Sequence, residues 1–186
     1  FFSEYIEGSS TNKCVEIYNP TGVAIDLSTG AYSLALYSGT NTSPNQTSNL
    51  TGVIASGDVF IVSNSGSNLA DITAESDVTI NNVINFNGDD IIALRKGGVI
   101  IDVFGQIGSS GNFAKDVTYV RKSIIQTGDV DGSDGFDPSV EWDNFAEDNT
   151  ADLGSHTSDC ISCVPYAVSI TGDLSYCAGN DTELDA

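Results

Sequence analysis

The most acidic stretch of the sequence is Thr127–Pro138, TGDVDGSDGFDP, in which oxygen-bearing side chains recur at short spacing. Calcium binds six to eight hard oxygen ligands, and carboxylates on alternate residues of a tight loop can converge on one ion. The spacing begins like an EF-hand loop, but Asp134 stands where that loop needs glycine, and Val140 stands at its final ligand position. Two interpretations are open: a simpler calcium loop and a solvated acidic turn. The candidate ligands are Asp129, Asp131, Ser133, Asp134 and Asp137.

A second group of charged residues occupies positions on or next to expected strands. Two carboxyl groups a few ångströms apart in a concave pocket could act as general acid and base. The alternative is a structural network, in which charges pair across the strands and Asp89 accepts hydrogen bonds from backbone amides at its Asn-Gly corner. We favour the structural network. The group comprises Glu4, Glu16, Asp89, Asp90, Arg121 and Lys122.

Motifs for covalent or cofactor chemistry are missing from the sequence. His156 is the only histidine, and no serine or cysteine near it lies in a context typical of a nucleophile. No dinucleotide-binding or phosphate-binding loop motif occurs. We therefore predict a protein that is not an enzyme, has no catalytic residues and has no cofactor other than the candidate calcium ion.

The charge balance excludes two classes of partner. With 26 acidic and 6 basic residues the net charge is -20, which opposes binding to phosphate backbones and to anionic lipid surfaces. No apolar run approaches the ~18–20 residues that a membrane span needs. We expect neither a nucleic-acid partner nor direct membrane insertion.

The cysteines and the polar composition favour an extracellular or cell-surface location. Four cysteines accompany abundant Ser, Thr, Asn and Gly, which fits an oxidising compartment. Cys160 and Cys163 form a single C-x-x-C, whereas the usual zinc pattern has two such pairs, so we favour a disulfide or a free pair over a metal site. There is no methionine, and we interpret Phe1 as a processed start after removal of a signal peptide.

A β-hairpin is predicted around Gly97-Gly98, because apolar runs flank the two glycines directly. A two-residue turn of the primed type needs positive φ, which glycine adopts without steric strain. In the simplest register Ala93 lies opposite Asp102, and Asp102 lies outside the core within reach of Arg95. The core face would then carry Ile92, Leu94, Val99, Ile101 and Val103.

Other alternating or apolar runs predict the remaining strands of an all-β sandwich. One short helix is expected within 63–77, Trp142 and Phe145 anchor a closing strand, and the almost wholly polar Ser38–Ser48 is expected to be an exposed loop. The expected strands are 1–6, 14–18, 23–27, 32–36, 59–62 and 117–122.

The hairpin segment FNGDDIIALRKGGVIIDVFGQIG resembles the lamin tail domain family in its bacterial secreted form. Four more segments agree in the family's order: FFSEYIEGSSTNKCVEIYNP, TYVRKS, FDPSVEW and LGSHT. The resemblance covers Phe1–Thr157 and implies an immunoglobulin-like antiparallel β-sandwich, but it supplies no catalytic residues. Because first and last strands lie close in such folds, we expect Cys14 to form a disulfide with Cys160 or Cys163.

The resemblance also organises the chain. We predict a lamin-tail-like domain at 1–157, a linker at 158–165 and the start of an incomplete second immunoglobulin-like module at 166–186. The expected function is a non-catalytic extracellular structural or adhesive module of a larger bacterial surface or secreted protein. Its partners would be neighbouring domains of the same chain or other surface proteins. The alternative is an accessory domain, for targeting or substrate binding, of a secreted hydrolase such as a nuclease or protease.

Overall fold

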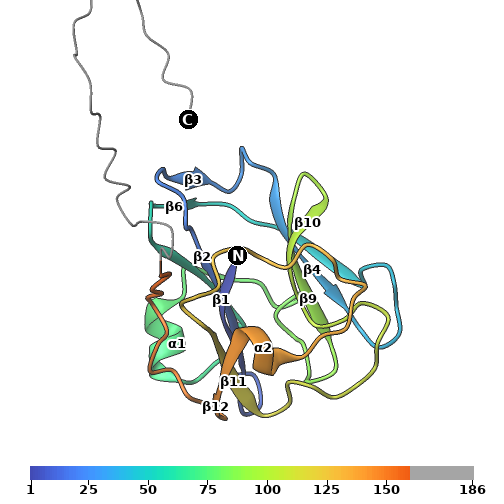
Figure 1. Ribbon diagram of the computed structural model, residues 1–186. Helices are drawn as coiled ribbons and strands as arrows, with labels where there is room; N and C mark the ends of the chain where they lie inside the picture. The colour runs from blue at the N-terminus through green and yellow to red at the C-terminus, as the bar shows by residue number, and fades with distance from the viewer. Residues whose placement is uncertain (160–186) are drawn as a thin grey trace, which may run out of the picture.

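The computed structural model describes residues 1–159, in which two β-sheets pack face to face (Figure 1). The six-stranded sheet has the order β12-β11-β1-β2-β7-β8, and the four-stranded sheet has the order β10-β9-β4-β5. Strands β3 and β6 form a small third sheet. Every pair is antiparallel except β7 with β8, so the predicted all-β antiparallel sandwich is confirmed.

The elements, in chain order, are β1 (Phe2–Glu7), β2 (Lys13–Tyr18), β3 (Ile25–Asp26), β4 (Tyr32–Tyr37), β5 (Gln46–Asn49), β6 (Val53–Ile54), β7 (Val59–Ser63), α1 (Ala70–Glu75), β8 (Val78–Thr79), β9 (Ile91–Lys96), β10 (Val99–Phe104), β11 (Val117–Arg121), α2 (Pro138–Glu141) and β12 (Trp142–Ala146). The short helix expected within 63–77 is α1. The expected strand at 23–27 is reduced to β3, and the end of the expected polar loop pairs with β4 as β5. No helix in residues 1–159 is long and apolar enough to cross a membrane.

The predicted hairpin forms, but its predicted register is wrong. Gly97 and Gly98 have φ values of +57° and +83°, as the turn requires. A β-bulge after Ile100 then places Asp102 opposite Leu94, where the simple register has Ile101. A bulge inserts one extra residue into one strand, so every later side chain changes face. Asp102 therefore points into the sandwich.

Aromatic rings fill the centre of the core between the two sheets. The Tyr5 ring stacks on Phe86 and Phe104 with centroid distances of 4.5 and 4.2 Å, and Phe104 meets Trp142 edge-on at 5.0 Å. Phe104 reaches this position because of the bulge. Val103 packs instead with Ala93 on the outer side of the four-stranded sheet.

The outer face of the six-stranded sheet is also covered. Helix α1 and the segment after β12 lie on it (Figure 1), and Ile72 and Leu153 pack against Ile6 and Cys14. A strand covered on both faces buries successive residues rather than alternate ones. All six residues of β1 are buried for this reason.

Candidate functional site

Arg121, the last residue of β11, is the centre of a buried ion-pair network. Its side chain is fully buried, and its two terminal nitrogens each donate to one oxygen of Asp102 at 3.2 Å. It also donates to the Glu141 carboxylate and to the Thr127 carbonyl, both at 3.2 Å. The planar guanidinium matches a carboxylate that offers both oxygens, which fixes the geometry as well as the charge.

Two aromatic rings enclose the guanidinium of Arg121. Its central carbon lies 4.5 Å from the Trp142 ring centroid and 5.4 Å from the Phe1 centroid. A cation over the face of such rings is attracted to their negative electrostatic potential. Because the rings also exclude water, the charge of Arg121 depends on its protein partners.

Asp102 connects the network to three parts of the chain. Besides binding Arg121, its carboxylate accepts hydrogen bonds from the backbone nitrogens of Phe2 at 2.6 Å and Asp129 at 2.8 Å. The expected contact with Arg95 is wrong, since Arg95 donates to the carbonyl of Gly98 in its own turn. The bulge is what brings Asp102 to Arg121, and the Asp129 contact ties the acidic loop to this network.

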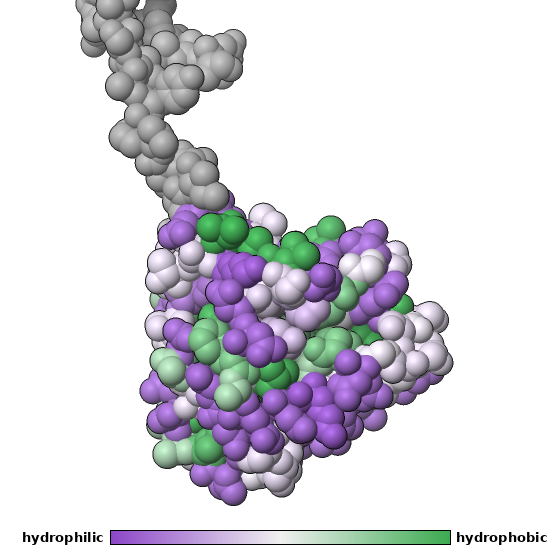
Figure 2. All heavy atoms as spheres, turned by 60° about the horizontal axis from the view of Figure 1, so that its bottom comes forward, coloured by the Kyte–Doolittle hydropathy of each residue, from purple (hydrophilic) through white to green (hydrophobic). Residues whose placement is uncertain are grey.

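The acidic loop borders an open hollow of about 260 Å³ beside α2, where four carboxylates gather around Phe136 and Val140. Figure 2, in which the bottom of Figure 1 comes forward, shows hydrophilic residues interspersed with hydrophobic ones on that face of the molecule. Burial raises the pKa values of Asp129 and Glu141, and the nearby Asp134 raises them further. The hollow therefore concentrates negative charge. Its carboxylates belong to Asp129, Asp134, Asp137 and Glu141.

Two of the candidate calcium ligands, Asp131 and Asp137, mainly stabilise their own turns. Asp131 accepts hydrogen bonds from the backbone nitrogen and hydroxyl of Ser133, and Asp137 does the same for Ser139 at the start of α2. These hydrogen bonds lower the pKa values of both carboxyl groups. Across residues 1–159, no group of three or more His, Cys, Asp or Glu side chains is arranged to hold a metal ion. The calcium site stays a prediction.

Glu4 and Glu16 face each other across β1 and β2 on the outer side of the six-stranded sheet, and each is only 1% exposed. Glu16 accepts hydrogen bonds from the Ser3 hydroxyl at 2.6 Å and the Gly154 backbone nitrogen at 2.7 Å. The carboxyl oxygens of Glu4 have no hydrogen-bond partner within the described part of the chain.

Burial and, to a smaller extent, the charge of Glu16 raise the pKa of Glu4 to about 9, and burial raises the pKa of Glu16 to about 7. The pair therefore holds a proton at neutral pH. Since both side chains are closed off from solvent, a substrate cannot reach them, and the geometry fits the structural interpretation of this group.

Asp90 and Lys122, the other charged candidates, bind backbone atoms. Asp90, and not Asp89 as expected, accepts a hydrogen bond from the Asn87 backbone nitrogen at 2.8 Å. Lys122 donates to the carbonyls of Ser139 and Val140 in α2 at 2.6 and 3.1 Å. Asp90 stabilises a local chain reversal, and Lys122 holds α2 next to the end of β11.

His156 packs edge-on against the rings of Tyr18 and Phe1, at centroid distances of 5.0 and 5.9 Å. Burial and, to a smaller extent, the nearby positive charge of Arg121 lower its pKa to about 4. The imidazole is therefore neutral near pH 7 and packs as an aromatic side chain.

Cys14, on the outer face of β2, is fully buried next to Ile6 of β1 and Ile72 of α1. Within the described residues it has no disulfide partner. Its expected partners, Cys160 and Cys163, lie outside the described residues, as do the predicted linker's end and the second module. The disulfide and the domain boundaries stay predictions.

A comparison with models of known protein families shows to which family the chain is related. The model of the Lamin Tail Domain family matches residues 1–108, which is more than half of the 186 residues. The chain belongs to the lamin tail domain family. No curated protein and no solved structure matches the chain. The family's immunoglobulin-like sandwich agrees with the observed sheets, so the expected fold is confirmed.

The matched part of the lamin tail domain ends just after β10, but the sandwich continues beyond it. Strand β11 pairs with β1, and β12 pairs with β11, so both extend the same six-stranded sheet. Asp102 lies inside the matched residues, whereas Arg121 and Trp142 lie after them. The ion-pair network therefore joins the two parts of the chain.

Sequence reasoning missed a second buried ion pair in this lamin tail domain. Glu7 and Lys13 lie opposite each other at the ends of β1 and β2, and Lys13 donates to the Glu7 carboxylate. Lys13 also lies 5.9 Å from the Phe86 ring centroid. The signal was available, since the two residues flank the five-residue turn GSSTN and an antiparallel hairpin makes such residues neighbours.

Proposed function

We propose that this lamin tail domain is a non-catalytic extracellular structural or adhesive module of a larger bacterial surface or secreted protein. The observation that carries the proposal is the burial of the charged groups best suited to acid–base chemistry. Arg121 and Asp102 neutralise each other behind aromatic rings, and Glu4 and Glu16 are each 1% exposed. A catalytic acid or base must reach a substrate, and these groups do not.

The extracellular part of the proposal depends on composition. A net charge of -20 favours solubility and keeps the module away from nucleic acids and anionic membranes. Four cysteines fit an oxidising compartment. Neighbouring domains of the same chain and other surface proteins are the proposed partners, and calcium at Asp129–Asp137 is the proposed ion.

Assays with the purified chain test the absence of catalysis. We expect residues 1–186 to leave DNA, casein and common glycans intact over long incubation. Hydrolysis that persists through repurification and is lost in the Glu4→Gln variant would contradict the proposal. The Asp143→Asn variant, at an exposed position on β12, is the matched control.

Protease treatment of intact cells that produce the parent protein tests its location. An externally added protease should remove the epitope of an antibody raised against this domain while a cytoplasmic marker survives. Protection of the epitope until the cells are lysed would rule out a surface location, and recovery of the epitope in the culture medium would identify a secreted form.

A further inference from the structure

An open polar hollow of about 520 Å³ lies at one end of the four-stranded sheet, where β4 ends and β5 begins. The segment before β9 forms its third side. All of its lining residues except Leu36 and Gly39 have polar side chains. Five of these side chains are amides, which belong to Asn45, Gln46, Asn82, Asn85 and Asn87.

Hydrogen bonds hold the three sides of this polar hollow together. The Ser38 backbone nitrogen donates to the Asn45 side-chain oxygen at 2.6 Å, which ties the end of β4 to the start of β5. The Ser48 hydroxyl donates to the Asn82 side-chain oxygen at 2.8 Å, which joins β5 to the segment before β9. The frame of the hollow is therefore ordered before any ligand binds, and such preorganisation lowers the entropic cost of binding.

Most polar groups of the lining take no part in these contacts. Asp90, which is 6% exposed, accepts a hydrogen bond from the Asn87 backbone nitrogen with one carboxylate oxygen and has the other available. Each amide offers two donor hydrogens and one acceptor oxygen. The hollow therefore presents free donors and free acceptors side by side. Within residues 1–159, no hydrogen bond to another protein group involves the side chains of Gln46, Asn85, Asn87 and Asp89.

The chemistry of the lining selects among classes of ligand. It contains no lysine, arginine or histidine, and the charges of Asp89 and Asp90 repel anions. An extended peptide needs apolar pockets for its side chains, and Leu36 is the only large apolar residue in the lining. No group of three metal-binding side chains occurs in the described part of the chain. A neutral polyol fits, because each hydroxyl group both donates and accepts.

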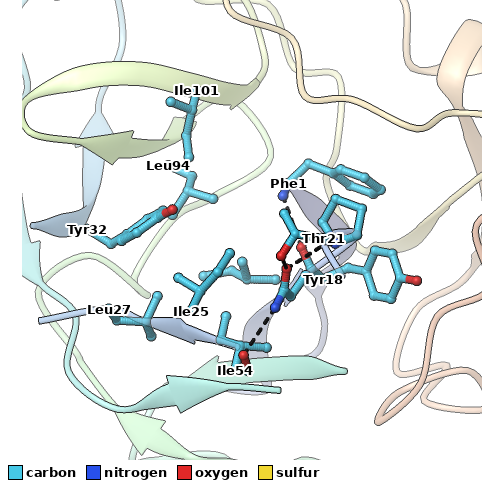
Figure 3. Close-up of a pocket in the computed structure, with 12 residues that line it drawn as sticks. Phe1, Tyr18, Thr21, Ile25, Leu27, Tyr32, Ile54, Leu94 and Ile101 are labelled. Carbon is cyan, nitrogen blue, oxygen red and sulfur yellow. Dashed lines mark hydrogen bonds between the residues drawn. The ribbon is translucent and has the colours of Figure 1, made fainter. Parts of the chain in front are cut away.

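A second hollow, beside β3 and β6, differs from the polar hollow in its lining. Its volume is about 160 Å³, and Figure 3 shows Ile25, Leu27 and Ile54 on one side of it and Leu94 on another. Hydrocarbon side chains form no hydrogen bonds, so hydroxyl groups placed there would lose their bonds to water. This apolar hollow is therefore an internal control for a polyol ligand.

We propose that the polar hollow binds a neutral carbohydrate, whose neighbouring hydroxyl groups pair with the free amides of Gln46, Asn85 and Asn87. A cavity of about 150 Å³ accepts a benzene-sized ring, so a hollow of about 520 Å³ has room for more than one sugar ring. The inference goes beyond the proposed function and stands without it, because a sugar site is compatible with a structural module and with an accessory domain.

NMR titration of the full chain, residues 1–186, tests the binding. The probes are cellotriose, mannotriose, maltotriose and triacetylchitotriose, which are neutral and differ in the arrangement of their polar groups. We expect at least one of them to shift the side-chain amide signals of Asn85 and Asn87 until the shifts saturate. The methyl signals of Leu27 and Ile54, in the apolar hollow, should stay unchanged. Failure of all four probes to shift the amide signals overturns the proposal.

The Asn85→Ala variant and its matched control, Asn49→Ala, locate the site. Both residues are exposed, and Asn49 lies on β5 outside the polar hollow, so neither change should disturb the fold. We expect Asn85→Ala to bind the active trisaccharide about tenfold more weakly, the size expected for one or two lost hydrogen bonds. Asn49→Ala should bind it as the wild-type protein does. Equal affinity in the wild-type protein and Asn85→Ala overturns the proposal.

Two further titrations of the wild-type protein distinguish other ligands of the polar hollow. Calcium chloride that shifts the Asn85 and Asn87 signals when no trisaccharide does would identify a metal site. A triserine peptide that shifts them when no trisaccharide does would identify a peptide site. Either outcome overturns the proposal.

Discussion

Carboxyl groups are buried against both faces of the six-stranded sheet, and the charge of the neighbouring side chain differs between the two faces. On the inner face Asp102 has a cation, Arg121, within hydrogen-bond distance of both of its oxygens. On the outer face Glu4 has another carboxyl group, Glu16, as its cross-strand neighbour. Burial penalises a charge in both places, but only the inner face supplies an opposite charge. The inner site is therefore an ion pair, and the outer site is a proton-holding pair.

Removing the negative charge from the inner site has the largest expected effect. The Asp102→Asn variant leaves Arg121 buried without its main counterion and weakens the hydrogen bonds to Phe2 and Asp129. We expect a loss of about 3–5 kcal/mol in the free energy of unfolding. Urea unfolding at neutral pH measures it. Asp143→Asn, at an exposed site, should change stability by less than about 0.5 kcal/mol.

The next prediction concerns calcium binding by the acidic loop, which is joined to the inner site by the hydrogen bond from Asp129 to Asp102. If an ion binds only the folded protein, thermal stability rises by about 2.7 kcal/mol at one hundred times the dissociation constant. A chelator should reverse the effect. The Asp131→Ala variant should fold normally in chelator and lose most of the response, whereas Asp143→Ala should retain it. Identical melting curves in calcium and in chelator would identify the loop as a solvated acidic turn.

The raised pKa of Glu4, in the outer pair of Glu4 and Glu16, predicts that the free energy of unfolding falls as the pH rises. Glu4 has a pKa of about 9 in the folded protein, above its ordinary value of 4.5. Between these values the folded state keeps a proton that the unfolded state has lost, so the stabilisation present below pH 4.5 disappears as pH rises toward 9. From pH 7 to pH 9 we expect a loss of about 1 kcal/mol per pH unit.

The Glu4→Gln variant distinguishes this pair from other titrating groups. Glutamine resembles the protonated carboxyl group and does not titrate, so the variant should match the wild-type stability near pH 4, exceed it at pH 7 and show a shallower pH dependence between pH 5 and pH 9. Denaturant unfolding across this pH range makes the comparison. Parallel curves for the two proteins would show that another group causes the fall.

The smallest expected effect comes from the hydrogen bond between Ser3 and Glu16. The hydroxyl donates at 2.6 Å and lowers the pKa of Glu16, because it stabilises the ionised form. Ser3→Ala should destabilise the protein by about 1–2 kcal/mol. The loss should be smaller at pH 5, where Glu16 is protonated, than at pH 8. A loss of the same size at both pH values would contradict a bond to the ionised carboxylate.

The sequence by itself determined the elements that depend on local pattern. Gly97-Gly98 specified a hairpin turn because few other residues adopt positive φ without strain. Alternating apolar residues specified the strands, and the segments that resemble the lamin tail domain specified the immunoglobulin-like sandwich. Each of these features depends on residues that are close together in the chain or on a motif that can be read directly.

Only the tertiary structure decided which carboxyl groups are paired. The bulge after Ile100 is invisible in an alternating pattern, yet it turns Asp102 toward Arg121, nineteen residues later in the chain. Glu4 and Glu16 become enclosed because the segment around Gly154, which is remote in sequence, covers their face of the sheet. The energy of a charge depends on the water and the charges around it, and in these two places distant parts of the chain determine both.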